Sequence, residues 1–283
     1  MNLKDLYESL CVKLKNFGIK EYHNEVDIIL KEVLNVTKVD LLTYPNRKVS
    51  LKDLKKIEYV IYRRELREPL AYILQHQEFY GFRFKVNGDV LIPRFETELI
   101  VEKVISLIRA NNNLEKIVDV GTGCGNIAIT IKKLCPQTEV VAVDFYVGAL
   151  RVAKDNAKSL VGEESITILK SDMLLELISR KYKCDIIVSN PPYVTEEEYE
   201  NLPPEIYFEP RHSLVCEKGV ELYYSLSQQS RKVLHKDGFV VIEINPFLEK
   251  EIKKIFLNEN FKLKDVILDY NNFVRGLVFQ NNG

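Results

Sequence analysis

The sequence lacks a long apolar run, a signal-like start and a basic excess. No stretch of its 283 residues approaches the ~18 apolar residues of a membrane-spanning helix. The opening MNLKDLYESL carries charges where a secretion signal needs apolar residues, so we expect no signal peptide and no membrane association. Lysine plus arginine number 40 against 41 acidic residues, a net charge of −1. This balance argues against DNA or RNA as the main partner.

Metal-binding and disulfide patterns are also missing. The cysteines are odd in number and show no CxxC spacing: Cys11, Cys124, Cys135, Cys184 and Cys216. We therefore expect reduced thiols in a cytoplasmic protein. His76 and His212 have no acidic residue at ligand spacing, so we expect neither a metal site nor a catalytic role for them. The 46% of hydrophobic residues and 29% of charged residues are typical of a globular chain.

Helical periodicity fills residues 1–75. Apolar residues recur at i, i+3, i+4 and i+7 over 3–17 and again over 26–34. A third helix is expected over 50–67, with Ser50 as its N-cap. The pattern predicts a small all-helical N-terminal domain. Alternating residues around Asn87-Gly88 then predict a β-hairpin, which we expect to form a linker over 76–95.

Residues 96–283 alternate between helical and strand patterns. Such alternation predicts a doubly wound, mainly parallel α/β sheet. Helices are expected over 96–110, 125–134, 148–160 and 219–235, and strands over 116–120, 139–143, 166–170, 184–189 and 238–244, with two more in 261–270 and 273–280.

A glycine-rich turn follows the first strand of this region. The segment 117–125 reads IVDVGTGCG, with Gly121, Gly123 and Gly125 opening the next helix. Such glycines let the backbone approach a ligand closely and present N–H groups at a helix start. The spacing departs from the dinucleotide pattern GxGxxG, and a purely steric role for the glycines fits the turn equally well.

Polar residues follow the other strands. Asp144 is placed to accept the hydroxyls of a ribose, although a helix-capping aspartate would fit its position too. Asp172 and Met173 end the next strand, where they could meet an adenine edge or simply form a solvated loop. Each of these positions, like Gly121 and Asn190, lies just past the end of a predicted strand. Because parallel strands end at one edge, we expect a shared ligand site there.

The sequence Asn190-Pro191-Pro192-Tyr193 follows an apolar strand. The two prolines lack backbone donors and hold the chain extended, which leaves carbonyl groups free to point into a pocket. An NH₂ group on a planar system could donate to the Asn190 side chain and the Pro191 carbonyl. Those bonds would direct the nitrogen lone pair at an incoming methyl group. We predict methylation of an amino or amide nitrogen.

These motifs together resemble the class I S-adenosylmethionine-dependent (Rossmann-like) methyltransferases and, within them, the PrmC/HemK family of glutamine methyltransferases. The resemblance covers nearly the whole chain: the helical N-terminal region, EPLAYILQHQEFYGFRFKVNGDVLIPRFETE, DVGTGCGNIAI, VVAVD, DIIVSNPPYV, FEPRHSL and VIEI. It implies transfer of a methyl group from S-adenosylmethionine, leaving S-adenosylhomocysteine, to the GGQ glutamine of class I peptide release factors.

The resemblance also implies roles for residues. The glutamine amide would be held by Asn190, Pro191, Pro192 and Tyr193, with no metal, and the cofactor by Asp119, Gly121, Thr122, Gly123, Cys124, Gly125, Asp144, Asp172, Met173 and Asn190. It gives residues 96–283 to the methyltransferase domain. We expect residues 1–75 to recognise the protein substrate, because a pocket for one glutamine side chain distinguishes proteins poorly.

Three positions depart from the family pattern. Phe95 replaces the second proline of PRPETE, Gln75 replaces a glycine, and 215–218 (VCEK) lacks a glycine pair. We expect these changes to leave the cofactor and amide sites untouched and to affect how the protein substrate docks.

Three alternatives remain open. A ribosomal-protein glutamine methyltransferase would share every motif. A DNA adenine-N6 methyltransferase would also use NPPY, but it needs a basic cleft and a target-recognition region, and the sequence offers neither. A non-catalytic ribosome-associated protein would not need the intact Asn190–Tyr193 motif. We expect the chain to act as a monomer.

Overall fold

The computed structural model describes residues 1–111, 113–216 and 219–283. The chain divides into two compact units: a helical unit of Met1–Gln75 with Pro204–Phe208, and a larger unit of His76–Pro203 with Glu209–Gly283. Nothing in the sequence indicates that Pro204–Phe208 belongs with the helices. In the described ranges no helix has both the length and the apolar character needed to span a membrane.

The helical unit is built around the stripe that the sequence predicts. Leu3, Leu6, Leu10 and Leu14 are all buried on one side of the first helix. Ser50 is the predicted N-cap, since its hydroxyl accepts a bond of 3.1 Å from the Asp53 amide. The helices of this unit are α1 (Leu3–Asn16), α2 (Tyr22–Leu34), α3 (Lys38–Thr43), α4 (Leu51–Glu65) and α5 (Leu70–Leu74), joined by the 3₁₀ turn η1 (Pro204–Phe208).

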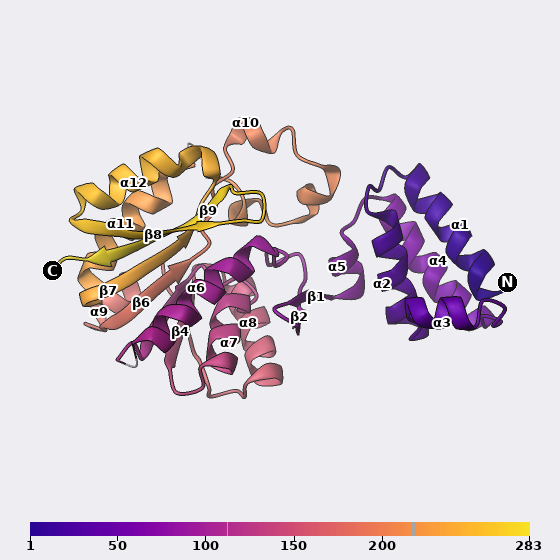
Figure 1. Cartoon of the computed structure of the whole chain (residues 1–283), viewed down its shortest axis with the longest axis horizontal. Helices are drawn as coiled ribbons and strands as arrows, with labels where there is room; N and C mark the ends of the chain where they lie inside the picture. Colours follow the sequence, from indigo (N-terminus) through magenta and orange to yellow (C-terminus); the bar gives the residue numbers. More distant parts are fainter. Residues whose placement is uncertain (112, 217–218) are drawn as a thin grey trace. The chain divides into compact units, whose positions relative to one another are not determined.

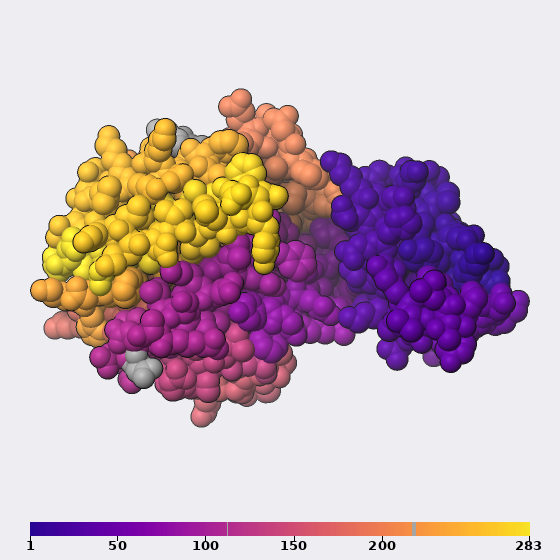
Figure 2. All heavy atoms as spheres, in the orientation of Figure 1, coloured from indigo at the N-terminus to yellow at the C-terminus, as the bar shows by residue number. Residues whose placement is uncertain are grey.

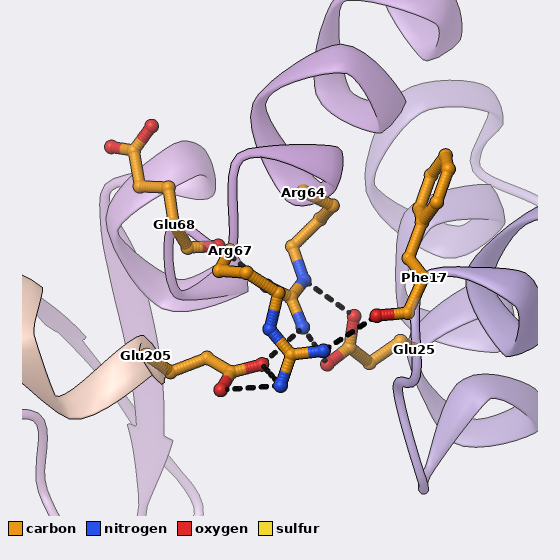
Figure 3. Close-up of polar contacts among 6 residues, drawn as sticks. All are labelled: Phe17, Glu25, Arg64, Arg67, Glu68 and Glu205. Atoms are coloured by element: carbon orange, nitrogen blue, oxygen red, sulfur yellow. Dashed lines mark hydrogen bonds and ion pairs between the residues drawn. The ribbon is translucent and has the colours of Figure 1, made fainter. Parts of the chain in front are cut away.

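An arginine lies inside this unit. Arg64 of α4 is 1% exposed, and its guanidinium bonds the Glu25 carboxylate at 2.8 and 3.1 Å. It also bonds Glu205 of η1 at 3.2 Å, and Arg67 bonds the same carboxylate at 2.8 Å (Figure 3). Two carboxylates surround a guanidinium that would otherwise be buried without a counter-charge. The segment Pro204–Phe208 is thereby tied to the helices by charge.

The hairpin forms, but not at the predicted turn. Strands β1 (His76–Phe79) and β2 (Phe82–Lys85) pair antiparallel, with Phe79 opposite Phe82, so Tyr80 and Gly81 form the turn. Both have positive φ, 52° and 74°, as a two-residue hairpin turn requires. Tyr80 is held there by a bond of 2.6 Å from its amide to Glu98. The prediction of a turn at Asn87-Gly88 is wrong.

Asn87 bends the chain by itself. Its side chain accepts from the Asp89 amide at 3.0 Å, and its carbonyl accepts from Val90 at 3.2 Å. The bend leads into irregular chain instead of a second strand. Gln75, at the position that the family resemblance gives to glycine, ends α5 in the left-handed region with φ 62°.

The larger unit contains the predicted doubly wound sheet, which is confirmed. Its seven strands run in the order β5-β4-β3-β6-β7-β9-β8, parallel except where β9 pairs with β7 and β8. The strands are β3 (Lys116–Val120), β4 (Glu139–Asp144), β5 (Thr167–Lys170), β6 (Cys184–Ser189), β7 (Leu234–Glu243), β8 (Phe261–Leu268) and β9 (Val274–Asn281).

Helices cover both faces of this sheet (Figure 1). One layer holds α6 (Glu96–Ala110), α7 (Asn126–Leu134) and α8 (Val147–Leu160), and the other holds α9 (Leu175–Ser179), α11 (Glu221–Val233) and α12 (Glu249–Asn258). The C-terminal segment, in yellow, comes to the surface of the face drawn in Figure 2. Short turns complete the unit: α10 (Glu196–Tyr199), η2 (Arg211–Ser213) and η3 (Pro246–Leu248). The sequence did not predict α9, α10 or α12.

Strand β3 is central to the connectivity. The chain moves outward from β3 to β4 and β5, then returns to β6 on the other side of β3. In open α/β sheets, ligands bind at the carboxyl ends of the strands at such a reversal. The fold therefore places a binding crevice at the ends of β3 and β6.

The buried arginine supplies a stability prediction. Replacing it in Arg64→Met leaves the Glu25 and Glu205 carboxylates without their shared partner, and we expect the free energy of unfolding to fall by on the order of 2 kcal/mol. Lys56→Met, which breaks the exposed Lys56–Asp53 pair on the same helix, should change it by less than about 0.5 kcal/mol. Chemical denaturation followed by circular dichroism measures both, and equal effects would contradict the assignment.

The same variant has a defined pH dependence. Burial raises the pKa of Glu205, but bonds from its own backbone amide, Arg67 and Arg64 outweigh burial, and the pKa is lowered. A carboxylate whose pKa is lower in the folded state stabilises the fold at pH values above its unfolded-state pKa of about 4.3. This contribution is lost as the pH falls through the folded-state pKa. The difference between the wild type and Arg64→Met should therefore shrink as the pH is lowered through that range.

Candidate functional site

The glycine turn lies at the end of β3. The Gly121 and Thr122 amides both donate to the Val143 carbonyl of β4, at 2.9 and 3.0 Å. Gly121 and Gly123 have φ of 73° and 55°, and a Cβ placed on either would meet no atom within 4 Å. Space is therefore open above both residues, where a ligand can approach the backbone.

Asp119 supports this turn from below. Its side chain is fully buried, and one carboxylate oxygen accepts from the Thr122 hydroxyl at 2.6 Å and the Ala128 amide at 3.2 Å. Burial raises the pKa of Asp119 to about 7. These bonds connect the turn to the first residues of α7. Asp119 and Thr122 do not line the cavity described below, so both act on the site from beneath it.

Cys124 and Gly125 are also packed inside. Burial raises the pKa of the Cys124 thiol to about 12, which excludes a thiolate nucleophile at neutral pH. Its carbonyl accepts from the Asn156 side chain at 2.8 Å. A Cβ at Gly125 would lie 2.7 Å from Ile129 of α7. The φ of 84° at Gly125 lies in the left-handed region, so the backbone conformation at the start of α7 favours glycine here without any ligand.

Asp144 lies at the end of β4, beside the glycine turn. Its carboxylate accepts from the Gly123 amide and the Tyr146 amide, both at 2.9 Å, and the residue is 8% exposed. Burial raises the pKa of Asp144, although these two bonds oppose the rise. The carboxylate is thus fixed in position at the cavity wall.

The ends of β3, β4, β5 and β6 meet around one cavity of about 590 Å³. This volume is in the range of small-molecule and cofactor sites. Its walls include the predicted residues Gly121, Gly123, Asp144, Asp172, Met173, Asn190, Pro191 and Pro192. The parallel strands therefore bring together eight residues that span about seventy positions of sequence.

Tyr193 points into a different environment. Its hydroxyl donates to the Glu243 carboxylate of β7 at 3.1 Å, and its ring packs against the core beneath the sheet edge. Burial and the Glu243 charge raise the pKa of Tyr193. Tyr193 does not line the cavity, although Pro192, which precedes it in the chain, does.

Thr97 and Glu243, which the sequence did not single out, are linked to Asn190 by hydrogen bonds. The Asn190 side-chain NH₂ donates to the Thr97 hydroxyl at 3.2 Å, and this hydroxyl donates to Glu243 at 2.6 Å. Burial raises the pKa of Glu243 to about 7. Both residues occur in segments that carry the family resemblance, FETE and VIEI, but only the fold shows that these segments meet at Asn190.

His212 was also missed. It lines the cavity, and its ring stacks on Tyr146 with centroids 3.4 Å apart. Burial lowers the pKa of His212, while the Asp144 and Asp89 charges act to raise it. Asp144, at the end of β4, is therefore near enough to act on the charge of His212, although the two residues are far apart in the sequence.

One of the three departures from the family pattern also reaches the cavity. Val215 and Cys216 line its wall, so the expectation that the departures leave the cofactor and amide sites untouched is wrong for them. Val194 pairs with Val215 in an isolated bridge, which brings this segment back to the end of the NPPY motif. Glu217 and Lys218 lie outside the described residues.

Known proteins match both parts of the chain. Residues 5–74 match the PrmC N-terminal domain, and residues 97–215 match the methyltransferase small domain. A release factor glutamine methyltransferase of Clostridium acetobutylicum is 35% identical over 92% of this chain and 92% of its own length. One from Fusobacterium nucleatum is 33% identical over 94% of this chain and 75% of its own length.

Among solved structures, the hMettl16 catalytic domain in complex with an RNA hairpin has a TM-score of 0.56 and 17% identity, covering 79% of this chain and 82% of that chain. At that identity the likeness shows the methyltransferase fold alone. The two release factor glutamine methyltransferases show the family as well as the fold, because each is similar in sequence to nearly the whole of this chain. They confirm the family that the motifs indicate. The chain belongs to the release factor glutamine methyltransferase family.

Proposed function

We propose that this protein transfers a methyl group from S-adenosylmethionine to the side-chain amide nitrogen of the GGQ glutamine in class I peptide release factors. The observation that carries the proposal is the position of Asn190. Its amide lies at the wall of a cavity that also contains Asp144 and the glycine turn. The same cavity thus offers a hydrogen-bond acceptor for a planar amide and a site suited to a nucleoside.

The cavity residues fit the cofactor. The open space above Gly121 and Gly123 suits close approach of the cofactor to the backbone. The fixed Asp144 carboxylate would accept from the two ribose hydroxyls, and the corner at Asp172 and Met173 would meet the adenine. When bound, the cofactor supplies an electrophilic methyl group, so the protein needs no strong general base.

The chain's own task is to orient the acceptor amide. Asn190 Oδ1 and the Pro191 carbonyl would accept the two amide N–H bonds, which turns the nitrogen lone pair toward the methyl group. With the cofactor bound, the nitrogen–methyl bond would form as the methyl–sulfur bond breaks, and one amide proton would pass to water. Pro191 and Pro192 stiffen the segment, so little reorganisation accompanies the reaction.

A protein substrate is also consistent with the charge of the chain. The net charge of −1 gives no general attraction for nucleic acid. We propose that the protein works as a monomer in the cytoplasm, where release factors act. A pocket that holds one glutamine side chain distinguishes proteins poorly, so we assign recognition of the release factor to the helical unit.

Asp144→Ala tests the cofactor assignment. Loss of the charged acceptor should weaken S-adenosylmethionine binding by roughly 2–4 kcal/mol, as expected for two charge-assisted hydrogen bonds. Asp155→Ala, which removes an exposed carboxylate from α8, is the matched control and should bind normally. Isothermal titration calorimetry on the folded variants measures both affinities, and an unchanged affinity in Asp144→Ala would remove the ribose assignment.

Asn190→Ala tests the amide assignment. The rate of methyl transfer to a GGQ peptide should fall by about two orders of magnitude or more, since a preorganised polar partner is lost. The cofactor affinity should change far less. Single-turnover transfer of a labelled methyl group measures the rate, and normal turnover by this variant would show that NPPY does not hold the amide.

Surface variants test the helical unit. Deleting it would also remove the partners of Glu205, so point changes are cleaner. Leu42 and Leu51 are 81% and 79% exposed, and the double variant Leu42→Glu/Leu51→Glu should lower kcat/KM on the intact release factor at least about tenfold. Val12→Glu, on the exposed side of α1, is the control. Peptide methylation should be unaffected, and equal losses on peptide and protein would contradict this surface assignment.

A further inference from the structure

We propose that Glu243 is a positioning residue that fixes, through Thr97, which way the Asn190 amide faces. The inference deepens the proposed function and rests on it, because it concerns how the acceptor for the substrate amide is oriented. Glu243 does not line the cavity and would act only through its partners.

Three elements meet at this carboxylate. Thr97 lies in the first turn of α6 and is 1% exposed, Glu243 ends β7 and is 2% exposed, and Asn190 follows β6. Glu243 Oε2 accepts from the Thr97 hydroxyl at 2.6 Å, and Oε1 accepts from the Tyr193 hydroxyl at 3.1 Å. The two oxygens of one buried carboxylate thus hold both ends of the NPPY motif, one directly and one through Thr97.

The direction of these hydrogen bonds depends on which of the groups has a hydrogen to donate. An ionised carboxylate can only accept, so the single proton of the Thr97 hydroxyl points to Glu243. What the hydroxyl presents to Asn190 is then a lone pair, which selects the NH₂ branch of the amide at 3.2 Å. The Asn190 carbonyl oxygen occupies the other branch. That oxygen is the atom to which an N–H of the substrate amide would donate its hydrogen bond.

The opposite orientation would defeat the reaction. With the amide flipped, Asn190 would offer N–H groups to the N–H groups of the substrate, and its oxygen would face a Thr97 lone pair. A protonated Glu243 permits this flip, because it can donate to Thr97 and free the Thr97 proton for the Asn190 oxygen. The ionised carboxylate excludes it.

The acidity of Glu243 gives the arrangement a pH dependence. Burial raises its pKa to about 7, the bonds from Thr97 and Tyr193 lower it, Glu96 raises it and Arg275 lowers it. The Tyr223 hydroxyl, from α11, donates to the main-chain carbonyl of Glu243 at 2.8 Å. Since the ionised form holds Asn190 correctly, kcat should rise with pH through about 7 and level off above it.

The most informative variants change one atom type each. In Glu243→Gln one branch of the side chain becomes a donor, so the two hydroxyls can no longer both be accepted. We expect kcat on a GGQ peptide to fall about 10- to 100-fold, the scale of losing an outer positioning partner. The dependence on pH near 7 should disappear. Thr97→Val, isosteric but without the hydroxyl, should fall similarly, and Thr97→Ser should recover at least about tenfold of that loss.

Two readouts separate positioning from structure. Cofactor affinity and the thermal midpoint of Glu243→Gln should stay close to the wild-type values, because a buried charge is replaced by a neutral side chain of the same shape. Tyr223→Phe, which removes the bond to the main-chain carbonyl of the same residue, is the matched control and should keep the wild-type rate and pH profile. The profile is measured at saturating cofactor, because Asp119 beneath the glycine turn also titrates near pH 7.

The outcomes are distinct. If Glu243→Gln keeps the kcat and the pH profile of the wild type, the inference is overturned and the proposed function still stands. A normal kcat in Thr97→Val would have the same consequence. Loss of rate in proportion to loss of cofactor binding or stability would make Glu243 a structural residue and overturn it too. If Glu243→Gln does not fold, the rates of Thr97→Val and Thr97→Ser test the same chain of bonds. Failure of the wild type to methylate any glutamine would overturn the proposed function and the inference together.

Discussion

Parallel strand pairing is the constraint on which the site depends. When β3, β4 and β6 run side by side in one direction, their carboxyl ends must lie at one edge, and the residue that follows each strand joins the same space. Gly121, Asp144 and Asn190 are neighbours for this reason alone. A different strand order would leave each of them with the ordinary local role that its own segment permits.

The second constraint is the low tolerance of a packed interior for charge. Three of the buried ionisable groups illustrate this: Asp119 under the glycine turn, Glu243 behind NPPY and Arg64 in the helical unit. Each is hydrogen-bonded by at least two residues from different segments of the chain. Removing any one partner costs more than an exposed contact would, so these groups fix geometry where flexibility would be harmful.

How far the sequence predicts the structure depends on how local the cause is. The strand and helix pattern of the larger unit, the Ser50 cap and the cavity residues from Gly121 to Pro192 follow from periodicity and from the rule for parallel sheets. The hairpin turn could not be chosen correctly, because Asn87-Gly88 has the stronger local signal. The Tyr80 conformation is held by Glu98, a contact between segments.

Long-range contacts explain the other omissions. Thr97 and Glu243 are 146 residues apart in sequence, and neither is unusual in its own segment. His212 looked isolated because Asp144 lies far away along the chain. The arginine partners of Glu205 could not be predicted either, because Arg64 and Arg67 also lie far from it along the chain. Local patterns thus predict which elements form, while the pairing of polar side chains between them requires the fold.

We propose one glutamine amide of a release factor as the methyl acceptor. The direct measurement is transfer of a labelled methyl group from S-adenosylmethionine to an intact class I release factor, with the modified residue mapped by mass spectrometry. A release factor with alanine in place of the GGQ glutamine, a ribosomal-protein mixture and duplex DNA serve as parallel acceptors. We predict one methyl group on the side-chain nitrogen of that glutamine and none on the alanine variant or the other acceptors. Label on DNA or on a ribosomal protein, or equal label on the alanine variant, would contradict it.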